Sequence, residues 1–332
     1  MKIGVVNNSL KGETRVAVTP LTTALYAKEG LQVVVEKGAG EKSGFCDDAY
    51  IQNKATLGSR TDILKCEIIL SVLPPKKSDL FSFKEGQWLV CDLTSFDDKA
   101  DMQDLVQTNI GVVDLGKMPR ISRAQVMDVL SSQAMIAGYR AATKALEMLS
   151  KTAPLLMSAA GTLVPAKAFV IGAGVAGLEA VSVLKRMGVN VYATDVRQES
   201  QVEVESVGGK FLQDLSVAFD GVDILITSAF SAGKKVPPIV FEKELAKLSK
   251  NAVVIDMAEG NVEDLKMRSD IRFLKNRHLE RELAYSASML FANNVYAFLK
   301  MFDFMGSKAD FEDEIMKSVL TCADGFLRGK LR

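Results

Sequence analysis

Short apolar runs alternate with stretches of helical spacing along the first third of the chain. The candidate strands are residues 3–6, 32–35, 68–72, 88–91 and 111–113. Alternation of this kind is typical of strand–helix–strand units, in which helices cover both faces of a parallel sheet. The pattern therefore predicts an α/β fold for this part of the chain.

The pattern changes between residues 122 and 149, where helix-forming residues continue without interruption. We expect one long helix here, which crosses between two domains. Residues 150–165 follow and contain Pro154, Gly161 and Pro165, so we expect a loop.

A second set of candidate strands comes after this loop, at residues 168–171, 190–194, 210–212, 224–227, 253–257 and 271–274. Their spacing suits a second doubly wound sheet. Residues 286–301 and 309–320 read as helices that return to the first domain. We therefore expect two Rossmann-like, doubly wound parallel-sheet domains with a cleft between them: residues 1–125 with residues 300–332, and residues 126–299.

Composition narrows the class of protein. The 332 residues are 48% hydrophobic, and 41 basic residues balance 41 acidic ones. Without a long block of either charge, neither nucleic acid nor a membrane surface is an expected partner. The four cysteines lack the close pairing of a metal site, so we expect no metal and a reducing, cytoplasmic setting. The apolar run at residues 166–183 carries Lys167, Glu179 and three glycines, which makes it a poor membrane span.

A glycine-rich turn follows the candidate strand at residues 168–171 and opens a helix. In it Gly172 permits a tight turn, Gly174 lets the backbone approach a pyrophosphate, and Gly177 allows close helix–strand packing. Asp195 ends the next strand, where a carboxylate accepts hydrogen bonds from a ribose 2′-hydroxyl and repels a 2′-phosphate. The motif thus predicts a dinucleotide site that prefers NAD. Two alternatives stay open: Arg197 could hold a 2′-phosphate, and Asp195 could be an ordinary solvated side chain.

Polar residues gather at the start of the long predicted helix. Gln125, Asp128 and Ser131 offer the donors and acceptors that a carboxamide and ribose hydroxyls require, and Arg120 adds charge. The same segment also has a plain structural interpretation. Ser122 with Gln125 three residues later matches a helix capping box. Spacing alone does not separate a nucleotide site from a capped helix.

Several motifs together resemble one protein family. They are Arg120-Ile-Ser-Arg-Ala-Gln125, Met127-Asp128, Leu130-Ser131-Ser-Gln133, Gly172-Ala-Gly-Val-Ala-Gly177, Asp195-Val-Arg197 and Glu205-Ser-Val-Gly-Gly-Lys-Phe211. They closely resemble the NAD(H)-binding component of proton-translocating NAD(P) transhydrogenases, whose relatives include the alanine dehydrogenases. The resemblance extends from residues 12–20 to residues 286–293 and so spans nearly the whole chain.

The resemblance implies roles for individual residues. Those matching Arg120, Gln125, Asp128 and Ser131 surround the nicotinamide and its ribose, with Gln125 and Asp128 closest to the reaction. Those matching Val175, Asp195, Val196 and Arg197 hold the pyrophosphate and the adenosine ribose. The family further implies a homodimer without a membrane span of its own. The NADP-binding component and the membrane components then lie on separate chains, which would place this one in the cytoplasm at the periphery of the inner membrane.

Departures from the family pattern keep two rival functions open. Only eight residues separate Phe211 from Asp220, where the family carries a long mobile loop, and residues 278–282 replace a family segment near the nicotinamide. A non-catalytic NAD-binding module is one rival. An amino-acid dehydrogenase of the alanine dehydrogenase type is the other, with Arg15 able to serve the substrate carboxylate. However, Ser71 stands where that family has its substrate lysine, and His278 is the only histidine.

Overall fold

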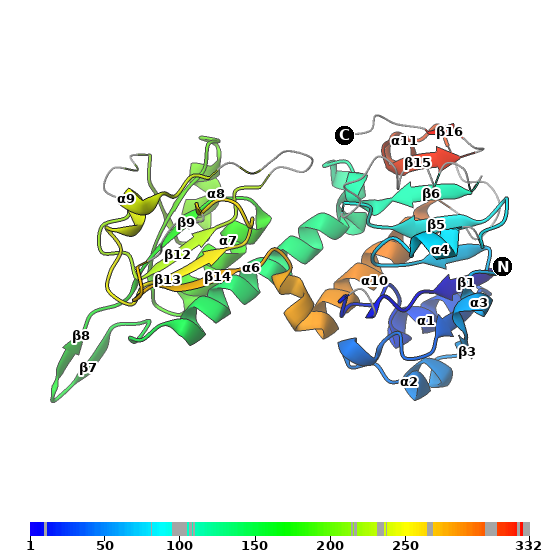
Figure 1. The fold of residues 1–332 in the computed structure, drawn as a ribbon, viewed down its shortest axis with the longest axis horizontal. Helices are drawn as coiled ribbons and strands as arrows, with labels where there is room; N and C mark the ends of the chain where they lie inside the picture. The colour runs from blue at the N-terminus through cyan, green and yellow to red at the C-terminus, as the bar shows by residue number, and fades with distance from the viewer. Residues whose placement is uncertain are drawn as a thin grey trace. The chain divides into compact units, whose positions relative to one another are not determined.

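The chain forms two compact units in a computed structural model (Figure 1). The structure describes residues 1–9, 12–80, 82–94, 105, 108, 110–213, 215, 218–230, 236, 238–263, 268–302, 311–323 and 326–327. Unit 1 comprises Met1–Gln133 and Leu283–Arg332, and unit 2 comprises Ala134–Glu282. No helix in the described part of the chain is both long and apolar enough to cross a membrane.

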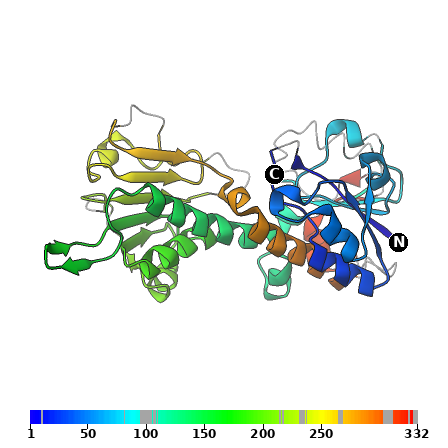
Figure 2. The same ribbon diagram turned by 90° about the horizontal axis from the view of Figure 1, so that it is seen from below.

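The unit boundaries differ from those expected at residues 125 and 299. The second boundary shifts because helix α10 (Ala284–Met301) belongs to unit 1 over its whole length. Its side chains Phe291, Val295 and Phe298 lie fully inside the core of that unit. Figure 2 shows α10 (orange) beside α1 (Pro20–Lys28, blue), where the Tyr26 and Tyr296 rings meet edge to face at 5.2 Å.

Unit 1 is built on an eight-stranded sheet in the order β16-β15-β6-β5-β4-β1-β2-β3. The strands β1 to β6 run parallel, and β15 and β16 are antiparallel additions at one edge. Their bounds are β1 Lys2–Val5, β2 Gln32–Glu36, β3 Thr56–Gly58, β4 Ile68–Leu70, β5 Trp88–Cys91, β6 Gly111–Asp114, β15 Leu320–Ala323 and β16 Phe326–Leu327. The predicted parallel sheet is confirmed, whereas β3, β15 and β16 were not expected.

Helices cover both faces of this sheet. They are α1, α2 (Asp47–Gln52), α3 (Arg60–Ile63), α4 (Lys77–Leu80), α10 and α11 (Glu314–Val319), with the 3₁₀ helices η2 (Glu41–Ser43), η3 (Leu115–Lys117) and η4 (Ser122–Met127). Strand β4 shows why its sequence is apolar without a break. Ile68 and Leu70 pack into one core and Ile69 into the core on the opposite face. A strand buried on both sides leaves no polar position in its pattern.

Unit 2 contains a six-stranded, wholly parallel sheet in the order β11-β10-β9-β12-β13-β14. Its strands are β9 Lys167–Ile171, β10 Asn190–Thr194, β11 Lys210–Phe211, β12 Ile224–Thr227, β13 Val253–Asp256 and β14 Arg272–Lys275. Counted from the first strand, this is the 3-2-1-4-5-6 order of dinucleotide-binding folds, and strands β1 to β6 of unit 1 follow the same order. The strand order reverses between β9 and β12, so ligands are expected beyond the carboxyl ends of these two strands.

The remaining elements of unit 2 include one that the sequence pattern did not predict. Its helices are α7 (Val175–Arg186), α8 (Ser200–Ser206), α9 (Glu242–Leu245) and the 3₁₀ helix η5 (Leu279–Leu283), which ends in unit 1. Residues 150–165, expected as a loop, contain a two-stranded antiparallel hairpin of β7 (Leu156–Ser158) and β8 (Gly161–Leu163). Every residue of both strands is exposed. A hairpin with solvent on both faces produces no apolar–polar alternation, which is why the pattern failed here.

Two helix predictions also need correction. The long helix expected from residue 122 is η4 followed by α6 (Val129–Met148), because the extended backbone of Asp128 separates them. The division between the two units falls within α6, after Gln133. Of the helix expected at residues 309–320, α11 occupies Glu314–Val319, and residues 309–310 lie outside the described part of the chain.

Candidate functional site

The glycine-rich turn of unit 2 connects β9 directly to α7, at the point where the strand order reverses. Gly172 has a φ of +95°, a left-handed conformation that favours glycine. A Cβ atom at Gly172 would also lie 2.9 Å from the backbone nitrogen of Ala229, in the segment that follows the neighbouring strand β12. Both the conformation and the space therefore require glycine at the first position.

The other two glycines of the turn have opposite surroundings. A Cβ atom at Gly177 would lie 1.8 Å from the carbonyl oxygen of Gly172, so α7 packs against the turn too closely to admit a side chain at this position. A Cβ atom at Gly174 would meet no described atom within 4 Å. The third glycine is thus required by packing. The second faces open space, which is what close approach of a ligand to the backbone needs.

The N-terminus of α7 has the features that favour an anion. Gly174 is its N-cap residue and has no side chain to accept a hydrogen bond from the first-turn N–H groups. The first turn also contains no acidic residue. Because α7 is a full twelve-residue helix, its dipole and exposed N–H groups favour a negatively charged group at this end.

Asp195 lies against this turn, and Arg197 hydrogen-bonds to both. The Asp195 carboxylate accepts hydrogen bonds from the backbone N–H of Ala173 at 2.7 Å and from Arg197, through its backbone at 2.9 Å and its Nε at 3.1 Å. Arg197 also donates from Nη2 to the Ala173 carbonyl at 3.1 Å. Partial burial acts to raise the pKa of Asp195, but the hydrogen bonds from Arg197 and Ala173 outweigh it and hold the pKa below its ordinary value. Val196, between them, is fully exposed.

Two residues that the sequence pattern did not single out form hydrogen bonds at the same carboxyl ends of the strands. Ser228, directly after β12, donates from Oγ to the Gly172 carbonyl at 3.0 Å. The buried Asn261 side chain accepts from the backbone N–H of Ala229 and donates to its carbonyl, both at 3.0 Å. Strand order was the signal that could have found Ser228, because the residue after the fourth strand faces the glycine turn in this topology.

In unit 1, Asp128 and Ser131 form the start of α6. The Asp128 carboxylate accepts from the Ser131 backbone N–H at 3.0 Å and from its hydroxyl at 2.5 Å, which is the geometry of a helix cap. The alternative interpretation, a capping box of Ser122 and Gln125, is therefore wrong in its residues. Ile121 precedes η4 without a side-chain cap, and the cap forms at Asp128 instead.

Arg120 and Gln125 differ from this pair. Both are exposed, and neither side chain forms a hydrogen bond with any residue that the structure describes. Gln125 lies one 3₁₀ turn before Asp128, whose backbone N–H donates to the Gln125 carbonyl at 3.4 Å. The four predicted residues of this stretch thus all belong to unit 1, whereas the predicted glycines, Val175, Asp195, Val196 and Arg197 belong to unit 2.

Arg15, considered as a receptor for a substrate carboxylate, is buried and paired within the protein. Its Nε and Nη2 bond to the two carboxylate oxygens of Glu13 at 2.8 and 2.9 Å, and its Nη1 donates to Gln133 Oε1 at 2.9 Å. Ser71 is buried and donates to Asn8 Oδ1 at 3.0 Å. His278 is partly exposed in unit 2, with Nδ1 3.3 Å from Glu280 Oε1. The connection between Phe211 and Asp220 is described at residues 212, 213, 215, 218 and 219; residues 214, 216 and 217 lie outside the description.

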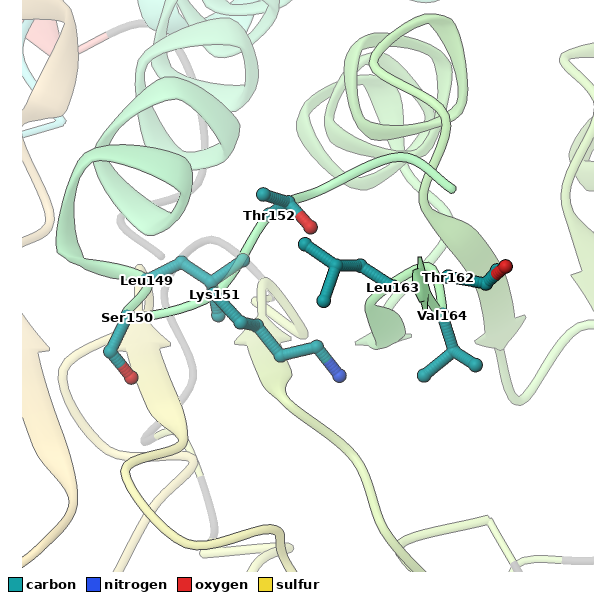
Figure 3. A pocket seen from close by; sticks show the side chains of 7 residues that line it. All are labelled: Leu149, Ser150, Lys151, Thr152, Thr162, Leu163 and Val164. Atoms are coloured by element: carbon teal, nitrogen blue, oxygen red, sulfur yellow. The ribbon is translucent and has the colours of Figure 1, made fainter. Parts of the chain in front are cut away.

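An open cavity of about 680 Å³ lies at the opposite ends of the unit 2 strands from the glycine turn. It is lined by residues 149–152 after α6 and by residues 162–164 of the hairpin (Figure 3). Lys151, which lines the cavity, shows where the cavity lies relative to the sheet. The Nζ of Lys151 bonds to the carboxylate of Asp223, directly before β12, at 2.9 Å. The cavity is therefore at the amino-terminal ends of the strands, away from the glycine turn.

Comparison with known proteins gives matches along the whole chain. The family described as alanine dehydrogenase/PNT, N-terminal domain, matches residues 4–137, and its C-terminal domain matches residues 141–330. An NAD(P) transhydrogenase subunit alpha protein of Rhodospirillum rubrum is 31% identical over 372 aligned residues, which cover 98% of this chain and 97% of that protein. Because this chain has 332 residues, the relative contains segments with no counterpart here.

Structural comparison agrees. The crystal structure of transhydrogenase from Sinorhizobium meliloti superposes with a TM-score of 0.90 at 31% identity and covers 98% of both chains. An alanine dehydrogenase from Methanococcus maripaludis is more distant, at 26% identity over 78% of this chain and 72% of that protein. The chain therefore belongs to the alanine dehydrogenase/PNT family, and within it to the NAD(P) transhydrogenase alpha subunits.

Proposed function

We propose that this chain is the NAD(H)-binding alpha component of a transhydrogenase. It exchanges hydride between NAD(H) held here and NADP(H) held on a partner chain, and membrane components on further chains couple the exchange to proton translocation. One observation carries the proposal. An uncapped helix N-terminus behind a glycine turn, with Asp195 against it, occurs in a chain that matches transhydrogenase alpha subunits over nearly its whole length.

The residues of unit 2 fit the adenosine diphosphate half of NAD. The pyrophosphate would bind the first-turn N–H groups of α7 at Val175, through the open space at Gly174. The carboxylate of Asp195 would accept hydrogen bonds from the adenosine ribose, and the exposed Val196 offers an apolar surface beside it. Arg197 would move aside or contact the ribose, because its guanidinium now covers the carboxylate.

The residues of unit 1 would hold the nicotinamide half. Gln125 has a carboxamide with unused donors and an unused acceptor among the described residues, which matches the carboxamide of nicotinamide. Asp128 and Ser131 hydrogen-bond each other, and each retains capacity for a ribose hydroxyl. Arg120 adds positive charge to the same stretch. Gln125 and Asp128 are the residues we assign to positioning the ring for reaction.

The chemistry explains why such a site needs no acid or base. When bound, NADH supplies a hydride, which carries its electron pair directly to the nicotinamide of NADP⁺ without a proton. The protein has only to bring the two rings into contact in the right orientation and to exclude water. Amide, hydroxyl and carboxylate side chains suffice for this task.

An amino-acid dehydrogenase would need more. It requires a cation for the substrate carboxylate and a proton donor for the amine and water steps. In this chain Arg15 is paired to Glu13 and Gln133, and Ser71 stands where the alanine dehydrogenase resemblance has a lysine. These contacts favour transhydrogenation over keto-acid chemistry.

We further propose that the chain forms a homodimer and acts in the cytoplasm beside its membrane partners. The exposed hairpin of β7 and β8 supports the homodimer, because a second copy of the chain could cover its apolar side chains. Its strands and flanks expose the large apolar side chains Leu155, Leu156, Met157, Leu163 and Val164. An isolated two-stranded hairpin is only marginally stable in water, so a partner surface is expected. Sedimentation of Met157→Glu, compared with the wild-type chain, tests this assignment: monomeric wild type at micromolar concentration would disprove it.

One pair of assays tests the catalytic proposal. We expect no NADH oxidation with pyruvate and ammonium, and hydride transfer to NADP⁺ when an NADP-binding component of a related transhydrogenase is added. Turnover with pyruvate and ammonium would transfer the chain to the amino-acid dehydrogenases. Tight NADH binding without turnover in either assay would identify a non-catalytic NAD-binding module.

A further inference from the structure

The buried side chain of Asn294, in α10, connects the residues on either side of Asp128. Its Nδ2 donates to the carbonyl oxygen of Val126 at 2.7 Å, and its Oδ1 accepts from the hydroxyl of Ser132 at 2.7 Å. Val126 lies in η4 and Ser132 lies in the first turns of α6. Both ends of one amide are therefore used to hold the stretch that contains Gln125, Asp128 and Ser131.

A second contact with α10 reinforces the first. The Gln133 side chain donates from Nε2 to the Ala287 carbonyl at 3.1 Å and to the Ser132 hydroxyl at 3.3 Å, and it accepts from Arg15. Adjacent residues of α6 are thus fixed to α10 through side chains. All these residues belong to unit 1. The buried Glu13–Arg15 pair, which hydride transfer does not require, is one end of this network.

The local backbone explains why these ties are needed. Asp128 is extended, with φ −76° and ψ 92°, so the hydrogen-bond ladder of η4 does not continue into α6. The Val126 carbonyl then depends on the Asn294 side chain for its partner. A 3₁₀ helix has poor hydrogen-bond geometry of its own and is held in position mainly by its surroundings.

We propose that Asn294 is a positioning residue for the nicotinamide half of the site. This rests on the proposed function, in which Gln125, Asp128 and Ser131 contact that half. Asn294 acts through the backbone of η4 and the Ser132 hydroxyl, and it contacts no substrate itself. Because hydride transfer depends steeply on the distance and orientation of the two rings, a shift of η4 by a fraction of an ångström impairs turnover before it impairs binding.

The test compares Asn294→Leu, which removes both hydrogen bonds at similar volume, with Gln87→Leu as a matched control. Gln87 is also a buried amide of unit 1, and its Nε2 donates to two carbonyl groups, those of Leu64 and Cys66, at 2.8 and 2.6 Å. Both variants lose buried hydrogen bonds and melt at lower temperature. We expect Asn294→Leu to lower kcat with the NADP-binding component by roughly 10- to 100-fold per folded molecule. Gln87→Leu leaves kcat unchanged.

Calorimetry separates positioning from general damage. Asn294→Leu should bind ADP-ribose, which lacks the nicotinamide, as the wild type does. Ser132→Ala removes one of the two hydrogen bonds and should give an intermediate kcat. If both side chains act through the same tie, Ser132→Ala has no further effect on kcat in the Asn294→Leu background. If Asn294→Leu does not fold, the kcat of Ser132→Ala tests the positioning role on its own, and an unchanged kcat contradicts it.

The failures are distinguishable. An active wild-type enzyme whose kcat falls equally in Asn294→Leu and Gln87→Leu, or in neither, overturns the positioning role alone. Independent, additive effects of Ser132→Ala and Asn294→Leu also count against it. A wild-type chain that transfers no hydride with the NADP-binding component overturns the proposed function, and this inference falls with it.

Discussion

The contrast between Gly174 and Gly177 yields a sharp prediction, because substitution by Ala adds the same methyl group in two different places. At Gly177 the new Cβ would lie 1.8 Å from the Gly172 carbonyl oxygen, and at Gly174 it would meet no described atom within 4 Å. Gly174→Ala should therefore fold normally and bind NADH poorly. Gly177→Ala should be destabilised.

The magnitudes follow from these surroundings. The backbone of Gly174, with φ −76° and ψ −173°, is one that Ala adopts readily, so we expect its melting temperature to stay within about 2 °C of the wild type. Its methyl group would occupy the approach to the α7 N-terminus and remove one charge-assisted hydrogen bond or more. That costs about 2 to 3 kcal/mol, or roughly 30- to 150-fold in NADH affinity. Overpacking against backbone at Gly177 costs about 3 kcal/mol, which lowers the melting temperature by roughly 6 to 12 °C.

Circular dichroism and NADH titration by calorimetry measure the two effects separately. NADH binding by Gly174→Ala at wild-type affinity would refute the assignment of the pyrophosphate to this turn. A wild-type melting temperature for Gly177→Ala would show that the close helix–strand packing is not required.

Three further predictions concern single side chains. NADH should bind at least roughly tenfold more tightly than NADPH in the wild type, and Asp195→Ala should reduce this difference in affinity. Tighter binding of NADPH by the wild type would show that Arg197, which could hold the 2′-phosphate, determines the preference. Tyr26→Phe should not destabilise the protein, since the buried Tyr26 hydroxyl has no partner among the described residues. Tyr50→Phe should lower the free energy of unfolding by about 1 kcal/mol, because the Tyr50 hydroxyl donates to a backbone carbonyl at 2.8 Å. Equal denaturation midpoints for the two variants would contradict this difference. Burial raises the pKa of Asp114 from 3.8 to about 6, so the folded state binds a proton more readily than the unfolded state, and the stability that this group contributes is lost as the pH rises from about 4 to about 6. Asp114→Asn should therefore gain about 2.4 kcal/mol relative to the wild type between pH 4 and pH 7.5, and parallel pH profiles of the two proteins would exclude the effect.

The buried strands were predictable because their environment is simple. β12 was predicted at its observed bounds, since an apolar run covered on both faces needs no knowledge of its neighbours. The bounds of β10 were also predicted, although Asn190 is exposed and Tyr192 is half-buried. β15 was missed because it depends on a distant partner, β6, against which it lies antiparallel. The hairpin of β7 and β8 has no buried face to pattern its sequence.

The local geometry of the candidate site was predictable to a similar extent. The glycine turn and Asp195 are local and follow from spacing. The Asn294 contacts are not, because 168 and 162 residues of sequence separate that side chain from Val126 and Ser132. Spacing left open a cap at Ser122, because Ser and Asp both favour caps, and the break in the backbone after η4 places the cap at Asp128.

The six parallel strands of each unit share one order, but the connection from the first strand to the following helix differs between the units. In unit 2 the residues Gly172–Gly174 are all that separates β9 from α7, so a helix begins directly beyond the strand. In unit 1 residues 6–19 intervene between β1 and α1, and Asn8 bonds across to Ser71 and Val72 after β4. A helix thus begins directly at a glycine turn in unit 2, where we propose that the diphosphate binds, whereas in unit 1 the longer connection is bonded to the chain after β4. Shortening residues 6–19 to a glycine turn is the change that would be needed to give this chain a second nucleotide site.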